Sequence, residues 1–294
     1  MIDRSIGDRI FDAVNYVLLT LVMLIVLYPL LFVLSASVSN PETVLRGEMW
    51  LIPKQINFDA YAKIFQNKDI LLGYGNTILY TLLGTAINLI MTICAAYPLA
   101  RKDFLGRGLI TGIIVFTMFF GGGLIPTYLL IKNLNMLDTL WVMVIPNAVA
   151  VWNIIIMRTF FQQSIPGEIQ EAAMIDGCSH IQTLLRIVLP LSMPIIAVMV
   201  LFYAVGHWNS YFNALIYLSS KDKFPLQLIL REILIQSDSG DMIKLTSESA
   251  VKMKMSVEGL KYAVLVVANL PMLVLYPFLQ RYFVKGIMIG ALKG

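Results

Sequence analysis

The sequence is poor in charged residues. Only 14% of its 294 residues are Asp, Glu, Lys or Arg, whereas an average soluble domain carries roughly 25%. Hydrophobic residues make up 58% of the chain and the mean hydropathy is +0.77. These values favour the lipid bilayer as the surrounding medium. The net charge of +4 is small and dispersed, so a nucleic-acid partner is not expected.

Cysteine and histidine are also scarce. The two cysteines, Cys94 and Cys178, stand in no CxxC pair and in no histidine-paired metal spacing. We expect both to be reduced, small structural residues. The two histidines, His180 and His207, have no further ligands at a suitable spacing. The sequence therefore predicts no metal site.

Several long apolar runs recur along the chain. A helix needs about 20 residues to cross a hydrocarbon core of about 30 Å. Six runs approach or exceed that length, at residues 14–34, 71–100, 109–131, 139–157, 187–218 and 260–279. The sequence therefore predicts an all-α membrane protein with six transmembrane helices and no separate soluble domain.

Two of these runs have particular features. The first could be a signal peptide, but it is too long for a signal core and follows residues of both charge signs. We expect a retained span, kinked at Pro29. The third contains Gly121-Gly122-Gly123 and Pro126. Because no strand precedes the glycines and no lysine follows at P-loop spacing, we expect an unwound turn near the outer surface.

The loops predict the sidedness. Residues 40–69 and 219–258 are long and polar, with short helices expected near residues 58–65 and 226–235. Residues 101–107 form a short basic loop, which is typical of the cytoplasmic side. Six spans then place both termini, this loop and residues 164–190 in the cytoplasm. Over whole loops, the outside holds slightly more Lys and Arg, so the prediction depends on the short loops.

Residues 164–190 are amphipathic and carry their own helix signals. Ser164 and Pro166 suit the start of a helix, and Gly177 suits the left-handed residue that ends one. The segment from Ser179 to Gln182 reads as a capping box for a second helix. The pattern predicts two short helices joined at a glycine, with alanines that permit close approach of a partner.

The same segment contains a spaced motif. Glu171-Ala172-Ala173 is followed by three residues, Gly177, nine residues and Ile187-Val188-Leu189-Pro190. This pattern resembles the cytoplasmic EAA loop of ABC importer permeases, and every fixed position is filled. An interfacial helix of any multi-spanning protein is the alternative, which amphipathicity alone would favour. The complete spacing favours the importer.

The resemblance extends to residues 95–107 and to the tail at residues 280–294, and it covers nearly the whole chain. The chain looks most like the second, maltose-type permease of carbohydrate importers. Residues 121–126 and the insert at 219–258 look closer to the branch that imports complex oligosaccharides. The implied fold is that of a type I ABC importer permease, one polytopic domain over residues 1–294 with its core at about 71–283.

The resemblance also implies an assembly in a bacterial cell membrane. Its members would be a second permease, an ATPase dimer that binds ATP and Mg²⁺, and an extracellular solute-binding protein, which in that branch is often a lipoprotein. This chain itself would need no cofactor. By the same resemblance, ATPase coupling would fall to Glu171, Ala172, Ala173, Asp176 and Gly177, with Glu171 pairing with a basic residue of the ATPase.

The spans hold almost no ionisable side chains. No Asp, Glu, Lys or Arg lies in the central part of any predicted span, and His207 lies near the end of one. Proton- or sodium-driven carriers generally need acidic groups at membrane depth, so a secondary transporter is disfavoured. The chain also has no GxxxxGK[ST] sequence. Both absences agree with a permease driven by a separate ATPase.

A sugar path needs aromatic faces and uncharged hydrogen-bonding groups. The candidates are Asn88, Asn153, Trp208, Asn209, Tyr211 and Asn213. Aromatic residues near a span end are commonly interfacial, and a buried Asn commonly joins two helices, so these readings remain open for each residue.

Three other functions remain as alternatives. The importer could carry a non-sugar solute. A membrane-embedded enzyme would need a nucleophile–base or carboxylate pair, and the sequence shows none outside the EAA loop, so we expect a transport subunit and no enzyme. A channel or scaffold subunit would not need the EAA loop.

Overall fold

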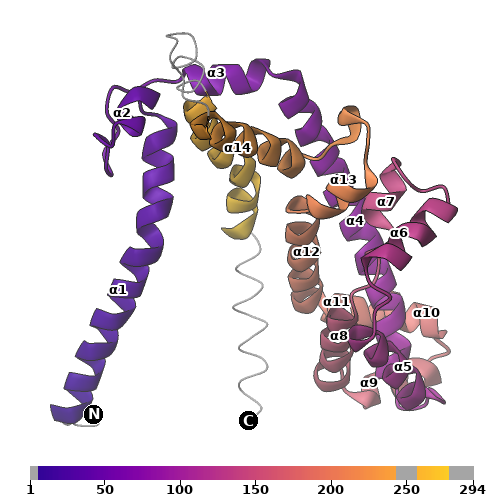
Figure 1. Ribbon diagram of the computed structural model, residues 1–294. Coiled ribbons are helices and arrows are strands. Elements are labelled where there is room, and N and C mark those ends of the chain that lie inside the picture. Colours follow the sequence, from indigo (N-terminus) through magenta and orange to yellow (C-terminus); the bar gives the residue numbers. More distant parts are fainter. Residues whose placement is uncertain (1–5, 243–256, 278–294) are drawn as a thin grey trace. The chain divides into compact units, whose positions relative to one another are not determined.

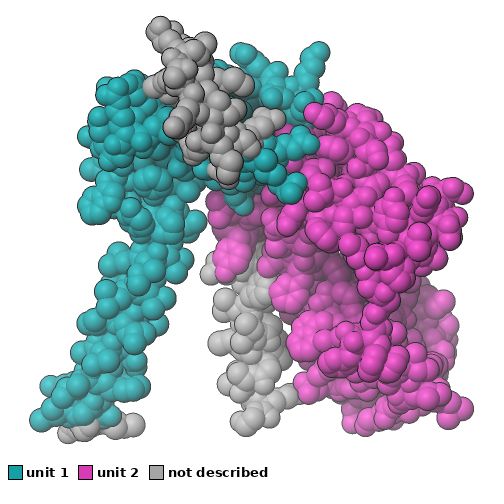
Figure 2. Space-filling model, in the orientation of Figure 1, with its two compact units in different colours: residues 1–70, 230–270 teal, residues 71–229, 271–294 magenta. Residues whose placement is uncertain are grey.

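The computed structural model describes residues 6–242 and 257–277, and the side chains of that part up to residue 235 and from residue 257. Its described residues form helices and connecting loops without any β-strand. The chain divides into two compact units (Figure 2), one of residues 1–70 and 230–270 and the other of residues 71–229 and 271–294. The first is called unit 1 and the second unit 2. The predicted tail at residues 280–294 lies outside the described residues.

Unit 1 contains one long apolar helix, followed by a loop with two short helices that is hydrogen-bonded to the end of the long helix. Helix α1 (Ile6–Ser37) continues through Pro29, and none of its most apolar 18-residue window is buried. Such an exposed apolar surface suits contact with lipid. Helices α2 (Pro41–Leu45) and α3 (Asp59–Gln66) follow, the latter close to the helix predicted at residues 58–65. The Tyr61 hydroxyl donates to Ser37 Oγ at 2.8 Å, which ties α3 to the end of α1.

Two further helices belong partly to unit 1. Helix α14 (Leu226–Met242) begins at the residue predicted for the helix in the insert and is longer than predicted. The helix Val257–Pro277 covers most of the sixth predicted span. Gly259 lies so close to the Pro41 ring that an added Cβ would come within 2.6 Å of it. Residues 243–256 of the predicted external insert lie outside the described residues.

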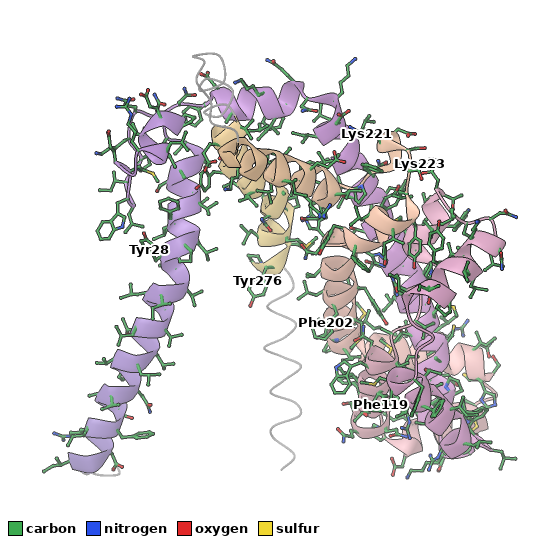
Figure 3. All side chains as sticks on the ribbon, in the orientation of Figure 1. Tyr28, Phe119, Phe202, Lys221, Lys223 and Tyr276 are labelled. Atoms are coloured by element: carbon green, nitrogen blue, oxygen red, sulfur yellow. The ribbon has the colours of Figure 1, made fainter. Side chains whose placement is uncertain are left out.

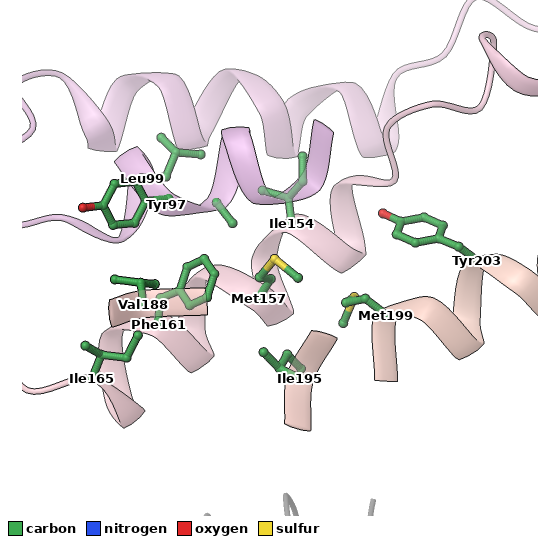
Figure 4. Close-up of a cluster of buried hydrophobic side chains, with 11 residues drawn as sticks. Tyr97, Leu99, Ile154, Met157, Phe161, Ile165, Val188, Ile195, Met199 and Tyr203 are labelled. Carbon is green, nitrogen blue, oxygen red and sulfur yellow. The ribbon is translucent and has the colours of Figure 1, made fainter. Parts of the chain in front are cut away.

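Unit 2 is built on α4 (Lys68–Ala100), most of which belongs to it. The helices that follow are α5 (Arg107–Phe119), α6 (Leu124–Asn133), α7 (Leu140–Val144), α8 (Val151–Ser164), α9 (Gly167–Ile175), α10 (His180–Thr183), η1 (Leu184–Val188), α11 (Leu189–Leu191), α12 (Met193–Trp208), α13 (Phe212–Tyr217) and η2 (Lys221–Lys223), as drawn in Figure 1. Two buried apolar clusters hold unit 2 together. One joins the end of α4 to α8 and α12 through Ala96, Met157 and Met199 (Figure 4). The other joins the opposite part of α4 to α7 and α13.

Three of the described helices are long and apolar enough to cross a membrane, namely α1, α4 and Val257–Pro277. Two bent pairs would raise the number to five. The pair α5 and α6 is bent by 109°, and the segments His180–Leu191 and Met193–Trp208 are bent by 84°. The third predicted span is therefore interrupted at its glycine triplet, as the sequence indicates. The change of direction there is far larger than an unwound turn in an otherwise straight span would give.

The fourth and fifth predicted spans have different bounds in the structure. The run at residues 139–157 is divided into α7 and α8, and α8 extends to Ser164. Pro146 explains the division, because proline lacks an N–H group and disfavours helix at the preceding residue. The run at residues 187–218 is divided as well, and its longest helix extends only from Met193 to Trp208, because the chain turns at Ser192 between Pro190 and Pro194.

Candidate functional site

The EAA loop folds as two helices that meet at a glycine. Helix α9 ends at Ile175 with Asp176 as its C-cap, and Gly177 has φ of +79°. The Gly177 N–H donates to Met174 O at 3.1 Å, and the Cys178 N–H donates to Ala173 O at 2.9 Å. These two bonds form the Schellman motif that satisfies the last carbonyls of a helix. The left-handed glycine predicted from the sequence is thus present.

Helix α10 begins with the predicted capping box. The Gln182 N–H donates to Ser179 Oγ at 3.3 Å, and the Ser179 N–H donates to Gln182 Oε1 at 2.8 Å. The prediction for the start of α9 needs correction. Ser164 is the last residue of α8, and Pro166 occupies the N-cap position without a side-chain hydrogen bond. Ser164 therefore does not cap α9, because it is still part of α8 and lies two residues before the N-cap position.

The predicted coupling residues divide between a buried and an exposed face. Ala173 is 4% exposed and packs inward. Glu171, Ala172 and Asp176 are exposed, so both acidic groups can reach a partner. Ile175, at 86% exposure, lies beside them. The exposed face thus combines negative charge with an uncovered aliphatic side chain.

Arg101 anchors the EAA loop to the end of α4. Its side chain is 8% exposed, and its guanidinium donates to both carboxylate oxygens of Asp103, at 2.9 and 2.6 Å. It also donates to the Tyr97 hydroxyl at 3.2 Å, and Nη2 lies 3.7 Å from the Met174 sulfur on α9. The hydrogen bonds from Arg101 lower the pKa of Asp103, and the Asp103 carboxylate raises the pKa of Arg101.

A cavity of about 530 Å³ lies beside this anchor. Its lining consists of Tyr97, Pro98, Arg101, Asp103, Phe104, Leu105, His180, Ile181 and Leu184. Ile181 is 70% exposed and Leu105 is 92% exposed. The cavity is thus formed by the end of α4, the basic loop at residues 101–107, and the part of the EAA loop that folds as α10 and η1.

Two carbonyl groups at the end of α4 accept hydrogen bonds from α8. Arg158 Nε donates to Leu99 O at 3.0 Å, and Gln162 Nε2 donates to Ala100 O at 3.5 Å. A cationic side chain at a helix C-terminus also interacts favourably with the helix dipole. No sequence pattern reveals the contact between Arg158 and Leu99, because the two residues are 59 positions apart.

Among the predicted path residues, Asn88 is fully engaged. It is 1% exposed, its Nδ2 donates to Asn147 O at 2.5 Å, and its Oδ1 lies 2.6 Å from His207 Nε2. Asn147 lies in the break between α7 and α8, where helical hydrogen bonds are missing. Asn88 therefore joins α4, α12 and this break at one point.

The other path residues lie near the end of α12 and in α8. Trp208 is 3% exposed and makes an edge contact with Tyr74 at 6.0 Å. Asn209 and Tyr211 are exposed, Asn213 is half-buried and Asn153 is 8% exposed. The first four lie within six residues of one another, whereas Asn153 lies in α8.

A cluster of hydrogen bonds around Asp138 joins two loops of unit 2 at the end that lies away from α9 (Figure 3). Asp138, with φ of +54°, accepts from the Ser219 and Ser220 N–H groups at 3.0 Å each, from Ser220 Oγ at 2.6 Å and from Lys223 Nζ at 2.8 Å. These bonds, led by that from Lys223, lower the pKa of Asp138. The four residues are called the Asp138 clasp. No sequence pattern indicated it.

The start of the predicted insert is also tied to α4. Asn76 Nδ2 donates to Asp222 O at 2.7 Å, the Tyr80 hydroxyl donates to Lys223 O at 2.8 Å, and the Leu226 N–H donates to Thr77 Oγ1 at 2.8 Å. In residues 6–242 and 257–277, no group of three or more His, Cys, Asp or Glu side chains could hold a metal ion.

The all-helical fold with its bent spans agrees with a membrane transport protein, and the comparison with known families gives the class. Residues 2–289 match the family of binding-protein-dependent transport system inner membrane components. The chain belongs to this family and is a permease subunit of an ABC importer.

Several relatives agree with this membership. Protein LplC of Bacillus subtilis is 43% identical over 98% of this chain and 96% of its own. The polygalacturonan/rhamnogalacturonan transport system permease protein YtcP of the same organism is 40% identical over 98% of this chain and 99% of its own. A crystal structure of a bacterial ABC transporter involved in the import of the acidic polysaccharide alginate contains a chain with a TM-score of 0.86. That chain is 34% identical, with 96% of this chain and all of that one covered.

Proposed function

We propose that this chain forms half of the translocation path of an oligosaccharide importer and receives ATP-driven motion through its EAA loop. The observation that carries the proposal is the geometry of α9 and α10. They meet at a left-handed Gly177, are held to α4 through Arg101, and present Glu171 and Asp176 outward. A rigid projecting turn with exposed acidic groups is suited to a basic cleft on a partner.

The proposed partner at this surface is the ABC ATPase dimer. Glu171 would pair with a basic ATPase side chain, and Ala172 would allow close approach because its side chain is small. Ala173 and the Schellman bonds would keep the turn in shape. ATP and Mg²⁺ would bind to the ATPase, so this chain would act as a transport subunit without chemistry of its own.

The proposed topology places the EAA loop and both termini in the cytoplasm. The Asp138 clasp and the exposed Lys221 then face the outside (Figure 3). This surface is proposed to receive the extracellular binding protein, with the insert at residues 219–258 shaping the entry. A second permease would complete the path, and α1 would contact lipid.

The proposed substrate is an oligosaccharide, and fragments of acidic polysaccharides are the first class to test. Support comes from the polygalacturonan/rhamnogalacturonan permease and from the alginate transporter described above. Asn209, Tyr211 and Asn213, with Trp208 and Asn153, would offer hydrogen bonds and apolar faces to sugar rings. Both the NH₂ group and the oxygen of the Asn88 amide are hydrogen-bonded within the chain. Asn88 is therefore proposed to support the wall of the path and not to contact the sugar.

The coupling proposal is tested by reversing one charge. The complex is purified through a tag on this chain and reconstituted with its binding protein, and ATP hydrolysis and uptake are measured. Glu171→Lys should release the ATPase on purification and abolish uptake. Glu168→Lys, an exposed glutamate on the same helix but outside the motif, is the matched control and should keep both. Normal uptake with Glu171→Lys would remove the support for EAA-loop coupling.

A further inference from the structure

A short apolar tip projects from the loop that follows α1. Residues 49–53 are Met, Trp, Leu, Ile and Pro, five consecutive residues without a charge. Trp50 is 72% exposed and Ile52 is 80% exposed. Large apolar side chains that stand together in the open mark a contact with a partner or with a membrane. Residues 49–53 are called the Trp50 tip.

Ser39 holds the two ends of the Trp50 tip together. The Ser39 hydroxyl oxygen lies 3.4 Å from the Met49 sulfur and accepts a hydrogen bond from the Lys54 N–H at 3.2 Å. Met49 is 3% exposed, and its N–H donates to Thr43 O at 3.4 Å. The Asn40 N–H donates to Lys54 O at 3.2 Å, which adds a further tie. The base of the tip is therefore fixed to the residues that directly follow α1.

From this base the Trp50 tip runs back along α1. The Ser35 hydroxyl donates to Leu51 O at 2.5 Å. The Trp50 indole makes an edge contact with the Tyr28 ring, with 6.4 Å between the ring centroids. Tyr28, which Figure 3 labels, precedes the last residue of α1, Ser37, by a helical distance of about 14 Å. The tip thus lies beside the last turns of the apolar helix and does not point away from it.

The Trp50 tip extends the exposed apolar surface of α1. None of the most apolar 18-residue window of α1 is buried, and this helix is long and apolar enough to cross a membrane. Trp and Tyr are enriched where a membrane meets water, because the ring is apolar while its N–H or O–H group can still reach water or headgroups. The pair of Trp50 and Tyr28 has this chemistry. Pro53 has no N–H group, and Leu51 O is bonded to Ser35, so fewer backbone groups of the tip need water.

Charged residues border the Trp50 tip and stop at its base. Arg46 and Glu48 precede residues 49–53, Lys54 follows them, and all three are exposed. A surface that changes from charged to apolar in this way matches the boundary between lipid headgroups and acyl chains. A protein partner would fit less well. Protein interfaces carry about one hydrogen bond per 100–200 Å², whereas the exposed side chains of the tip offer only the Trp50 indole N–H.

We propose that the Trp50 tip inserts into the outer leaflet of the membrane beside α1 and fixes the depth of that helix. Trp50 and Ile52 contact phospholipid acyl chains near the headgroups, and the headgroups lie at the level of Glu48 and Lys54. The 32 residues of α1 extend about 48 Å, well beyond a hydrocarbon core of about 30 Å, so its length alone leaves its depth and tilt open. The choice of leaflet follows from the proposed topology, and the insertion does not depend on EAA-loop coupling.

The first test locates the tip with a spin label at Ile52→Cys, a position whose exposure leaves room for the label. The complex is reconstituted in phospholipid vesicles after Cys94 and Cys178 are replaced by alanine and the accessible cysteines of the other subunits are removed. Collision rates of the label with oxygen, which dissolves in lipid, and with a water-soluble nickel chelate are then compared. At residue 52 we expect a high oxygen rate and a low nickel rate. Lys54→Cys, at the base of the tip, is the matched control and should show the reverse.

Two other results at residue 52 would each overturn the proposal. A high nickel rate, equal to that at residue 54, would place the tip in water. Low rates with both reagents would mean that protein covers the tip, and the second permease or the binding protein would then be its partner. The EAA loop lies in unit 2 and contributes nothing to these rates, so coupling is still tested separately by Glu171→Lys.

The second test asks whether Trp50 holds the tip in the membrane. Trp50→Glu, introduced into the chain labelled at residue 52, places a charge where acyl chains are expected, so the tip should leave the membrane. The nickel rate at residue 52 should then rise to that measured at residue 54. Trp50→Phe keeps an apolar ring and should leave the rate low. An unchanged rate with Trp50→Glu would overturn the anchoring role of Trp50.

Discussion

The sharpest structural demand in the EAA loop is the left-handed conformation of Gly177, which a Gly177→Val substitution would oppose. An added Cβ would meet no atom within 4 Å, so the substitution creates no steric clash with the rest of the chain. Its cost comes from the backbone alone, because φ is +79°. A side chain at such an angle costs about 1–3 kcal/mol, with a β-branched residue at the upper end.

This cost is large enough to change the population of the turn. About 1–2 kcal/mol shifts a two-state ratio by a factor of roughly 5–30. The bonds from Gly177 and Cys178 to α9 would open together, and the angle between α9 and α10 would no longer be fixed. We expect Gly177→Val to insert normally in the membrane and to lose binding-protein-stimulated ATP hydrolysis and uptake together.

Gly177→Asn is the matched control, because asparagine tolerates the left-handed region far better than valine. Gly177→Asn should keep most of the uptake, although its side chain is larger than that of glycine and is polar. The assay is ATP hydrolysis and uptake by the reconstituted complex, with the amount of ATPase bound to each variant measured in parallel. Full uptake with Gly177→Val, or equal loss with valine and asparagine, would refute the argument from backbone conformation.

Three further outcomes are expected. The pKa of Asp138 is lowered in the folded chain, so the stabilisation from its hydrogen bonds is complete above the unfolded pKa of about 3.9 and is lost only as pH falls further. The Ser219 and Ser220 amides should therefore stay protected from hydrogen exchange between pH 5 and 8. Asp138→Asn should lower that protection about fivefold throughout this range. Gly84→Ala should displace His207 from Asn88 and destabilise the complex by about 1–3 kcal/mol in thermal unfolding, whereas Gly75→Ala, on the same helix in open space, should have far less effect. A cysteine at the exposed Gln163, in a chain without Cys94 and Cys178, should react with an impermeant thiol reagent only from the cytoplasmic side, and labelling in intact cells would overturn the topology.

Local signals in the sequence predicted the elements whose cause is local. The capping box at Ser179, the left-handed Gly177 and the break at residues 121–123 depend on residue types within a few positions. The same holds for the helices near residues 58–65 and 226–235. The family followed from the spaced motif that begins at Glu171, because every fixed position was filled.

Features that join distant residues could not be predicted in this way. The Arg101 contact with Met174 and the Asp138 clasp connect segments 73 and 85 residues apart. Asn88 was chosen as a polar side chain at membrane depth, but its amide is occupied by His207 and Asn147, which lie on two other segments. The division of the fourth span had a local signal in Pro146, but proline also occurs inside α4 and α1 without ending them, so that signal alone is ambiguous.

The length of α4 has a mechanical consequence. Its 33 residues extend about 50 Å, well beyond a hydrocarbon core of about 30 Å, so both ends stand outside the core or the helix crosses it obliquely. One end carries the contacts to Asp222 and Lys223, and the other leads directly into Arg101. A rigid rod of this length that pivots by about 10° at its middle moves each end by about 4 Å, in opposite directions. A small change of the angle of α4 would therefore displace its two ends at the same time and in opposite directions, the one near Asp222 and Lys223 and the one that leads into Arg101.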